Sequence, residues 1–554
     1  MSIAEHTAGT TTKPRACPSW GNVTFVHVLN KWADTRADVP FIHRNDGRTL
    51  TYGQTSDQVK QLAAVLSSQG LRPGDSLLLR SGRRVEGLLL LLAAWRLGLN
   101  VCLVPESLSA RQITEGAVSY APKMAVDAGT LPKVEAHELR IMEAAASLFT
   151  IRLVGCFGNA PDGVIDLESL PVTSDELAHE EDVLELDIEQ DAQMHTLHAG
   201  ADGKLERFSR SQINVLSQAL ACAMATNLHP SSVVGTAYDP GGIHGLLAAA
   251  LPCLLVGSTL QLFDALDPSL DARLQLWHEE SSDHRLVLPA VFAAQPAFVG
   301  SSPVPRSRCW IASGCTPVAL PADDTVLVDC GGTALVPAHS DGEGQLVCRP
   351  GAITLKPETG DPLSFGTLRL EGTAQSNATS GSLMSGQIAL VGPLVAARNG
   401  KNSDMQITNQ YAKLAEDDDR KPLYVLLEQD TDAIRVGPYN VLLPAVNRAL
   451  GLTGRWQDAA VFAVPDPLLG HRLEVAVEPR AGDDDAQKLP TLDNVRTMLR
   501  ESGIGDAALP VKMHLVTRVP RRGRGYVDVT ALPGYLIEET GEPVSDVFAS
   551  QAVA

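Results

Sequence analysis

Aromatic side chains, paired cysteines, positive charge and long apolar runs are all scarce in this sequence. Aromatic residues make up 5% of the 554 residues, and the nine cysteines form no Cys-x-x-Cys pair. A structural zinc site or a disulfide framework is therefore not expected, and the cysteine pattern suits a reducing cytoplasm. The net charge of −20 argues against nucleic acid or an anionic membrane surface as a partner.

Two apolar runs, at 88–99 and 246–255, are the only stretches that suggest a membrane. Both are shorter than the roughly 20 residues that a membrane-spanning helix requires, so we interpret them as buried elements. The first 18 residues are polar and contain no apolar core of a signal peptide. These observations predict a cytoplasmic protein without a membrane span.

The length of the chain predicts two or more domains. Helical patterns alternate with short apolar strands, which indicates an α/β protein with largely parallel strand pairing. Glycine- and serine-rich turns at 337–390 predict a β-rich subdomain, and a smaller α+β unit begins near Asp432. The predicted organisation is a flexible N-terminus (1–21), a large N-terminal domain of two α/β subdomains plus the β-rich subdomain (22–430), a small C-terminal domain (431–535) and a tail (536–554).

Hydrophobic periodicity and turn residues predict the individual elements. Gly70 is expected to end the helix that begins at Tyr52, as a glycine after a helix C-terminus does. The charged tract at 415–420 is interpreted as a solvated turn and not as a metal site. The predicted helices are 24–38, 52–70, 88–99, 209–226, 245–255, 444–450 and 491–502, and the predicted strands include 40–43, 76–79, 101–104, 258–262, 286–288, 309–312 and 459–464.

Several motifs follow one another in a characteristic order. They include Thr49-Leu-Thr-Tyr52, Leu71-Arg-Pro-Gly-Asp75, Ile311-Ala-Ser-Gly-Cys-Thr-Pro317 and Gly386-Gln-Ile-Ala-Leu-Val-Gly-Pro393. Their order and spacing, from about residue 22 to about 535, resemble the adenylate-forming superfamily of acyl-CoA synthetases, peptide-synthetase adenylation domains and luciferase-like AMP-binding enzymes. The resemblance implies two steps: a carboxylate attacks the α-phosphorus of Mg-ATP, and a thiol or amine then takes the acyl group.

The stretch that matches the family's phosphate loop keeps its glycines but loses its other groups. The family pattern is Thr-Ser-Gly-Thr-Thr-Gly-x-Pro-Lys, and this chain retains Gly200 and Gly203. Glu206 stands at the lysine position, and Asp202 adds a second negative charge where the triphosphate would lie. Like charges at short range disfavour a bound anion. Lys204 lies at the variable position, and we interpret the stretch as a surface loop.

The segment that matches the family's Tyr-Gly-x-Thr-Glu motif reads Cys330-Gly331-Gly332-Thr333-Ala334. The resemblance assigns the aromatic ring to adenine stacking and the glutamate to Mg²⁺. Cys330 lacks the ring, and Ala334 has no oxygen for a cation that requires oxygen ligands. Cys330 is interpreted as a buried structural cysteine, with a nucleophilic thiol as the alternative.

The remaining family positions are replaced as well. Gln410 stands for the ribose-binding aspartate, and Gln429 stands for the arginine that contacts the nucleotide at the hinge. Tyr526 stands for the catalytic lysine and is neutral near pH 7. A literal Thr359-Gly360-Asp361 lies too early in the chain and is interpreted as a chance match. No catalytic residue and no metal ligand are assigned.

These replacements predict a degenerate homologue, a pseudoenzyme of the carboxylate–AMP ligase class that uses neither ATP nor Mg²⁺. It would act by binding an acyl or aryl carboxylate, an acyl carrier protein or an active ligase of a secondary-metabolite pathway. The alternative is a divergent acid–thiol ligase or acyltransferase with relocated groups. Its candidates are the cations Lys204, Arg207, Arg521, Arg522 and Arg524, with His198 and Cys330 as base or nucleophile. His244 is interpreted as a packed or capping histidine.

Overall fold

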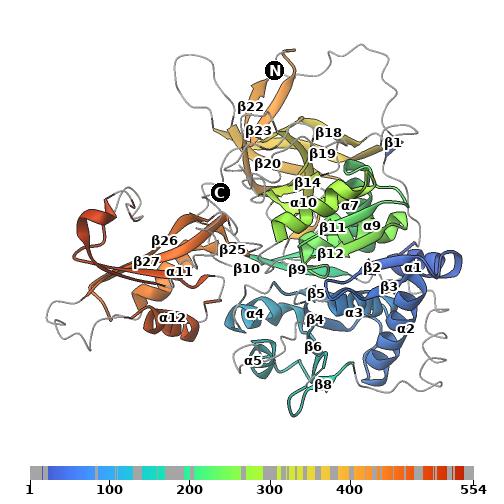
Figure 1. Ribbon diagram of the computed structural model, residues 1–554, viewed down its shortest axis with the longest axis horizontal. Coiled ribbons are helices and arrows are strands. Elements are labelled where there is room, and N and C mark those ends of the chain that lie inside the picture. Colours follow the sequence, from blue (N-terminus) through green and yellow to red (C-terminus); the bar gives the residue numbers. More distant parts are fainter. Residues whose placement is uncertain are drawn as a thin grey trace.

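The computed structural model has three β-sheets with helices packed on them (Figure 1). It describes residues 15–16, 23–81, 85–105, 108, 110–128, 140–158, 160–168, 193–199, 205–263, 270–290, 308–312, 320, 324–330, 333–340, 346–355, 363–374, 385–398, 405–417, 419–426, 433–436, 439–452, 455–466, 470–479, 491–502, 504–505, 508–520, 527, 529 and 531–541.

The first sheet has the strand order β21-β10-β9-β5-β4-β6-β7-β8. Its central strands β4 to β7 pair in parallel, whereas β9 and β10 form an antiparallel hairpin. The strands are β4 (Ser76–Arg80), β5 (Asn100–Leu103), β6 (Met124–Asp127), β7 (Leu153–Cys156), β8 (Ile165–Asp166), β9 (Met194–Ala199), β10 (Leu205–Arg210) and β21 (Ala397–Arg398). The accompanying helices are α3 (Val85–Arg96), α4 (Ala110–Ala117), η1 (Val118–Tyr120) and α5 (Arg140–Ser147).

The second sheet joins a parallel α/β part to the β-rich subdomain. Its parallel strands, in spatial order, are β2 (Pro40–His43), β12 (Thr259–Leu262), β11 (Val233–Thr236), β13 (His284–Pro289), β14 (Arg308–Ala312) and β15 (Thr325–Asp329). The antiparallel continuation comprises β16 (Leu335–Ser340), β17 (Leu346–Cys348), β18 (Gly351–Leu355), β19 (Leu363–Ala374), β20 (Ser385–Val391), β22 (Met405–Glu416) and β23 (Pro422–Leu426), and β3 (Thr49–Thr51) borders the opposite edge. Helices α1 (Phe25–Thr35), α2 (Tyr52–Ser68), α7 (Gln212–Ala225), α8 (Ile243–Gly245), η3 (Leu246–Ala250), α9 (Leu251–Val256) and α10 (Leu270–Glu280) accompany it.

Local sequence explains why α2 has these bounds. The Thr51 hydroxyl accepts a hydrogen bond from the Gln54 backbone N–H, and the Gln54 side chain accepts one from the Thr51 N–H, which is a capping box. Gly70 has a φ of +86°, a left-handed conformation that L side chains rarely adopt. The predicted glycine stop is confirmed.

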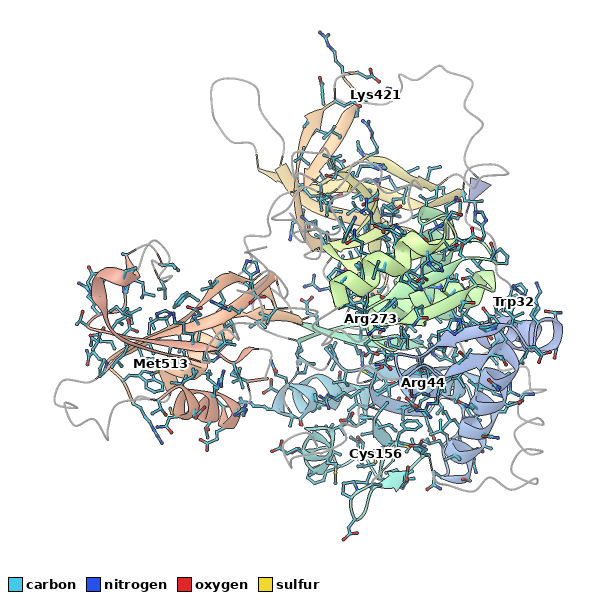
Figure 2. The ribbon with its side chains drawn as sticks, viewed as in Figure 1. Trp32, Arg44, Cys156, Arg273, Lys421 and Met513 are labelled. Carbon is cyan, nitrogen blue, oxygen red and sulfur yellow. The ribbon has the colours of Figure 1, made fainter. Side chains whose placement is uncertain are left out.

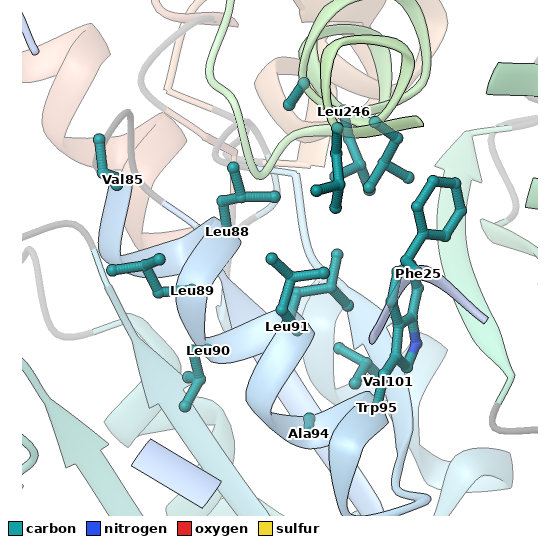
Figure 3. Close-up of a cluster of buried hydrophobic side chains, with 14 of the residues drawn as sticks. Phe25, Val85, Leu88, Leu89, Leu90, Leu91, Ala94, Trp95, Val101 and Leu246 are labelled. Atoms are coloured by element: carbon teal, nitrogen blue, oxygen red, sulfur yellow. The ribbon is translucent and has the colours of Figure 1, made fainter. Parts of the chain in front are cut away.

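The two apolar runs form the main hydrophobic core. Nine leucine, alanine, valine and tryptophan side chains of α3 are buried, and the segment 246–254 is buried against them. Figure 3 shows Leu246 above Leu88 and Leu91, with the rings of Phe25 and Trp95 close by. The expectation of buried elements in place of membrane spans is confirmed, and no helix among the described residues is long and apolar enough to cross a membrane.

The third sheet belongs to the C-terminal unit, shown in orange and red in Figure 1. It comprises β24 (Ala433–Val436), β25 (Tyr439–Leu442), β26 (Asp458–Asp466), β27 (Gly470–Glu478), β28 (Lys512–Val516) and β29 (Leu536–Gly541). Helices α11 (Leu443–Leu452) and α12 (Leu492–Glu501) pack on it, and η8 (Leu532–Tyr535) precedes β29. Met513 of β28 lies inside this unit (Figure 2) and is part of its core.

The predicted fold class, a large N-terminal α/β part with a β-rich subdomain and a small α+β part, is confirmed. Several boundaries differ from the predictions, among them the helices expected at 24–38 and 88–99, which lie at Phe25–Thr35 and Val85–Arg96. The helix expected from residue 209 begins at Gln212, because Ser209 and Arg210 are still paired in β10. Strand β1 (Arg15–Ala16) pairs with β19, which is not expected of a flexible terminus. The small unit extends past 535, because β29 pairs with β28.

The charged tract after β22 is a turn at the tip of a hairpin, as the sequence predicts. The Asp417 and Lys421 backbones bond to each other across it, and the Lys421 ammonium lies 2.9 Å from the Asp419 carboxylate. Figure 2 shows Lys421 projecting from this tip.

We expect Leu91→Ala to lower the free energy of unfolding by about 2–5 kcal/mol, because it leaves a cavity in the main core. The Leu91 side chain has 0% exposure, whereas that of Leu276 on α10 is 64% exposed. The matched change Leu276→Ala should therefore cost less than about 0.5 kcal/mol. Urea unfolding of both variants measures this, and equal losses would contradict the packing described for α3.

Candidate functional site

The loop that resembles the phosphate loop lies between β9 and β10. His198 is paired with Glu206 across this hairpin. Gly200, Gly203 and Lys204 lie outside the described residues, so their placement stays a prediction. Glu206 is described, and its side chain is 11% exposed. The carboxylate at the family's lysine position is thus largely buried at the base of the loop.

Glu206 forms an ion pair with Arg398. The Arg398 guanidinium donates from Nη2 to Glu206 Oε1. Strand β21 pairs with β10 so that Arg398 is opposite Phe208, two residues from Glu206 and therefore diagonal to it on the same face. Because an unpaired buried carboxylate is costly, Arg398 supplies the charge that lets Glu206 remain there.

The segment that resembles the adenine and magnesium motif follows β15, and Cys330, Thr333 and Ala334 are its described residues. The Cys330 N–H donates to the Ala334 carbonyl at 3.0 Å, and the Thr333 N–H donates to the Cys330 carbonyl at 3.3 Å. Cys330, Thr333 and Ala334 are each at most 2% exposed, while Gly331 lies outside the described residues. Ala334 offers only a methyl group at the position of the metal ligand.

Cys330 is a buried thiol. Burial raises its pKa well above the usual value, and the neighbouring Cys348 and Asp329 act in the same direction. A protonated thiol is a poor nucleophile. This agrees with a structural cysteine and argues against Cys330 as the nucleophile of the alternative hypothesis.

Gln410 lies on β22 and has 0% exposure. Its backbone N–H donates to the Thr408 hydroxyl at 3.1 Å. Gln429, Tyr526, Arg521, Arg522 and Arg524 lie outside the described residues, as does Thr359-Gly360-Asp361. Within the described part of the chain, no group of three or more His, Cys, Asp or Glu side chains is arranged to hold a metal ion.

Sequence reasoning did not identify Arg210 as a site residue. Its side chain is buried beside the turn at 330–334, where Nη1 donates to the Thr196 hydroxyl at 3.0 Å and Nη2 donates to the Thr333 carbonyl at 3.3 Å. Burial lowers the pKa of the guanidinium to about 10, and the charge of Asp329 acts in the opposite direction. Arg210 therefore keeps its positive charge at neutral pH.

A histidine and an aspartate from distant segments meet at the same end of the parallel strands. His244 Nε2 lies 2.9 Å from Asp329 Oδ2, and the two side chains are 12% and 5% exposed. Asp329 ends β15, whereas His244 belongs to α8, which follows β11. Ligands of open α/β sheets bind at the carboxyl ends of the strands. The sequence contains one indication of this pair. Asp329 lies directly before Cys330, at the start of the segment that resembles the adenine and magnesium motif.

The turn that carries His244 is held by Asp239. The Ser81 hydroxyl donates to Asp239 Oδ1 at 2.8 Å, and the Gly241 N–H donates to the same oxygen at 2.9 Å. A Cβ atom at Gly245 would collide with the Asp239 carbonyl oxygen, so this close approach requires glycine. The Ser81–Asp239 bond also links the turn after β4 in the first sheet to the turn after β11 in the second.

His195 is a second buried histidine near the hairpin. Its Nδ1 lies 2.7 Å from the Ser209 hydroxyl, and its ring meets Tyr120 edge-on at 4.9 Å between centroids. Burial lowers the pKa of His195 to about 4, with smaller contributions from Arg207 and Arg210. The imidazole is therefore neutral at pH 7. Arg207, a candidate cation, donates to the Ser119 carbonyl at 3.4 Å.

Known proteins resemble this chain in sequence and in fold. Residues 29–185 match the family described as AMP-binding enzyme, and residues 446–525 match the AMP-binding enzyme C-terminal domain. A probable 2-succinylbenzoate–CoA ligase of Mycobacterium tuberculosis is 36% identical over 107 residues, which are 19% of this chain and 27% of that protein. The matched part thus spans about a quarter of the length of this curated relative.

Two solved structures share the fold over nearly the whole chain. The amide bond synthetase McbA from Marinactinospora thermotolerans has a TM-score of 0.66 and 18% identity, covering 92% of this chain and 99% of its own. An o-succinylbenzoate CoA synthetase double mutant from Bacillus subtilis has a TM-score of 0.62 and 15% identity, covering 92% and 98%. At these identities the likeness shows a common fold.

We expect Arg398→Ala to lower the free energy of unfolding by about 1–3 kcal/mol, because Glu206 then remains buried without its partner. In the Glu206→Gln background the same change should cost much less. Urea unfolding of the two single variants and the double variant gives the coupling energy. Additive losses would show that the two groups do not stabilise each other.

We expect His195 to make the protein less stable in acid. Its folded pKa of about 4 lies below the ordinary value of 6.5. As the pH falls from 6.5 towards 4, the unfolded state takes a proton that the folded state does not, at up to about 1.4 kcal/mol per pH unit. His195→Asn should therefore lose less stability than the original chain between pH 6.5 and pH 5 in urea unfolding. Identical losses would contradict the low pKa.

Proposed function

We propose that this chain, which matches the AMP-binding enzyme family over residues 29–185 and its C-terminal domain over residues 446–525, no longer adenylates carboxylates with Mg-ATP and instead acts by binding. Its ligand is an acyl or aryl carboxylate, an acyl carrier protein or an active ligase of the same pathway. The observation that carries the proposal is Glu206, buried and paired with Arg398 at the position of the family's phosphate-binding lysine.

The charge at this position decides whether a triphosphate is attracted. Two unit charges 4 Å apart interact by about 4 kcal/mol at an effective dielectric constant of 20. Replacing lysine by glutamate converts such an attraction into a repulsion. Arg398 offsets much of the repulsion, but its charge is already engaged by Glu206. The pair is therefore close to neutral, and it provides no free cation for a phosphate.

The other replacements add to this effect. Ala334 removes the oxygen ligand for Mg²⁺, and buried Gln410 brings no charge to the ribose position. Gln429 and Tyr526 stand for an arginine and a lysine. Five exchanges that all affect nucleotide binding are explained more simply by loss of adenylation than by five separate compensations. Neither ATP nor Mg²⁺ is therefore expected as a cofactor.

We expect calorimetry to detect no saturable heat when Mg-ATP is added at millimolar concentration, and thermal unfolding to be unchanged. An active member of the superfamily, measured under the same conditions, is the control. Saturable binding, or pyrophosphate release with any carboxylate, would overturn the proposal.

A variant series tests the assigned cause. Combining Glu206→Lys with Ala334→Glu restores both family groups, and nucleotide binding should then become measurable if these positions limit it. Arg398→Ala should be included in this series, since Arg398 would otherwise repel the introduced lysine. If the original chain binds the nucleotide and the variants bind it equally well, the positions are wrongly assigned.

A further inference from the structure

The proposed loss of adenylation leaves one arrangement without a role, the pair of His244 and Asp329. His244 lies two residues beyond the histidine position of the superfamily, which is occupied here by Gly242. The 2.9 Å contact between His244 Nε2 and Asp329 Oδ2 joins residues 85 positions apart in the chain. The tertiary fold brings the two residues together, and the pair could not be inferred from the motifs.

The contact determines which ring nitrogen carries the proton. An ionised carboxylate can only accept hydrogen bonds, so Nε2 must donate to Asp329. In the neutral imidazole, Nδ1 then has a free lone pair and can accept a proton. The carboxylate therefore holds the ring in the tautomer and orientation that a general base requires.

Asp329 is more deeply buried than His244, as is required of a carboxylate that orients a solvent-accessible base. The Asp329 side chain is 5% exposed, whereas the His244 side chain is 12% exposed and can be reached from solvent. The charge of Asp329 in turn raises the pKa of the nearby Arg210 guanidinium, against the effect of burial. The Tyr238 ring, 5.6 Å from the imidazole ring, borders the pair on another side.

The backbone around His244 is held rigidly. Asp239 accepts hydrogen bonds from Ser81 and from the Gly241 N–H, and the Leu246 N–H donates to the Gly242 carbonyl at 2.8 Å. Functional groups carried by such fixed turns lose little entropy when a substrate binds. Both His244 and Asp329 follow parallel strands at their carboxyl ends, where α/β sheets bind ligands.

We propose that His244, positioned by Asp329, is a general base that hydrolyses acyl thioesters. This inference rests on the proposed loss of adenylation and adds a reaction to the proposed binding role, because a chain that cannot activate a carboxylate needs an acyl group that is already activated. His244 Nδ1 takes a proton from water as its oxygen attacks the thioester carbonyl. The tetrahedral intermediate then expels the thiolate, which receives the proton from His244, and the products are a carboxylic acid and a free thiol.

Water attacks the thioester directly, because neither of the neighbouring groups Cys330 and Arg210 can act as the nucleophile. Cys330 is buried with a raised pKa and cannot form an acyl-enzyme at neutral pH. Arg210 is buried and bonded to Thr196 and Thr333. His244 is thus a proposed catalytic residue, and Asp329 is a positioning residue that acts through it.

The test measures thiol release from S-benzoyl- and S-octanoyl-N-acetylcysteamine with the full chain in the absence of ATP. We expect turnover above the buffer rate for at least one of them. His244→Gln should reduce kcat by about 100-fold or more, the contribution of a general base. His27→Gln is the matched control, because glutamine preserves the capping box with Thr24 at an exposed position, and it should leave kcat unchanged.

Asp329→Asn separates positioning from mere support of the fold. The asparagine N–H₂ would donate to Nε2 and leave the proton on Nδ1, so kcat should fall about 100-fold while KM stays the same. If Asp329→Asn only destabilised the fold, that variant would show a lower melting temperature and a smaller active fraction. In that case the conservative variant Asp329→Glu would not restore activity. Restoration by Asp329→Glu in a folded protein supports the positioning role.

Thiol release at the buffer rate for both thioesters, or equal rates for the original chain and His244→Gln, would overturn the inference. Neither result bears on nucleotide binding, which calorimetry measures separately. Saturable Mg-ATP binding together with His244-dependent hydrolysis would refute the proposed function alone.

Discussion

Buried charge at the junction of the two large sheets is the constraint around which this site is organised. Arg210 brings a guanidinium into an interior position, and such a charge is tolerated only where hydrogen bonds and an opposite charge compensate for lost water. Thr196, the Thr333 carbonyl and Asp329 provide this compensation. Asp329 also contacts His244, so polar contacts and the attraction between Arg210 and Asp329 connect the β9–β10 hairpin, the end of β15 and the segment after β11.

The same principle explains the base of the loop that resembles the family's phosphate loop. Superfamily members place a cation there for a ligand that carries negative charge. In this chain the negative charge belongs to the protein, because Glu206 is buried and Arg398 pairs with it. The charge of Glu206 is thus balanced within the chain.

The frame of the molecule was largely predictable. Apolar runs identified α3 and the segment 246–255 as buried elements, and the capping box at Thr51 with Gly70 delimited α2. Motif order predicted the superfamily fold. The error at residue 209 arose because Ser209 and Arg210 continue a helical pattern, while pairing with β9 keeps them in a strand. Tertiary pairing overrode a local preference there.

Local patterns are enough to place helices and strands, because these elements depend on residues a few positions apart. The residues at the motif positions could be identified in the same way. The partners of the site residues lie much farther away. Arg398 is 192 positions from Glu206, Thr333 is 123 positions from Arg210, and Asp329 is 85 positions from His244. Those pairings depend on strand register and on how two sheets meet, and neither is encoded in any short stretch of sequence. The sequence therefore determined which chemical groups stand at the motif positions, and the packing of the sheets determined which charges neutralise each other.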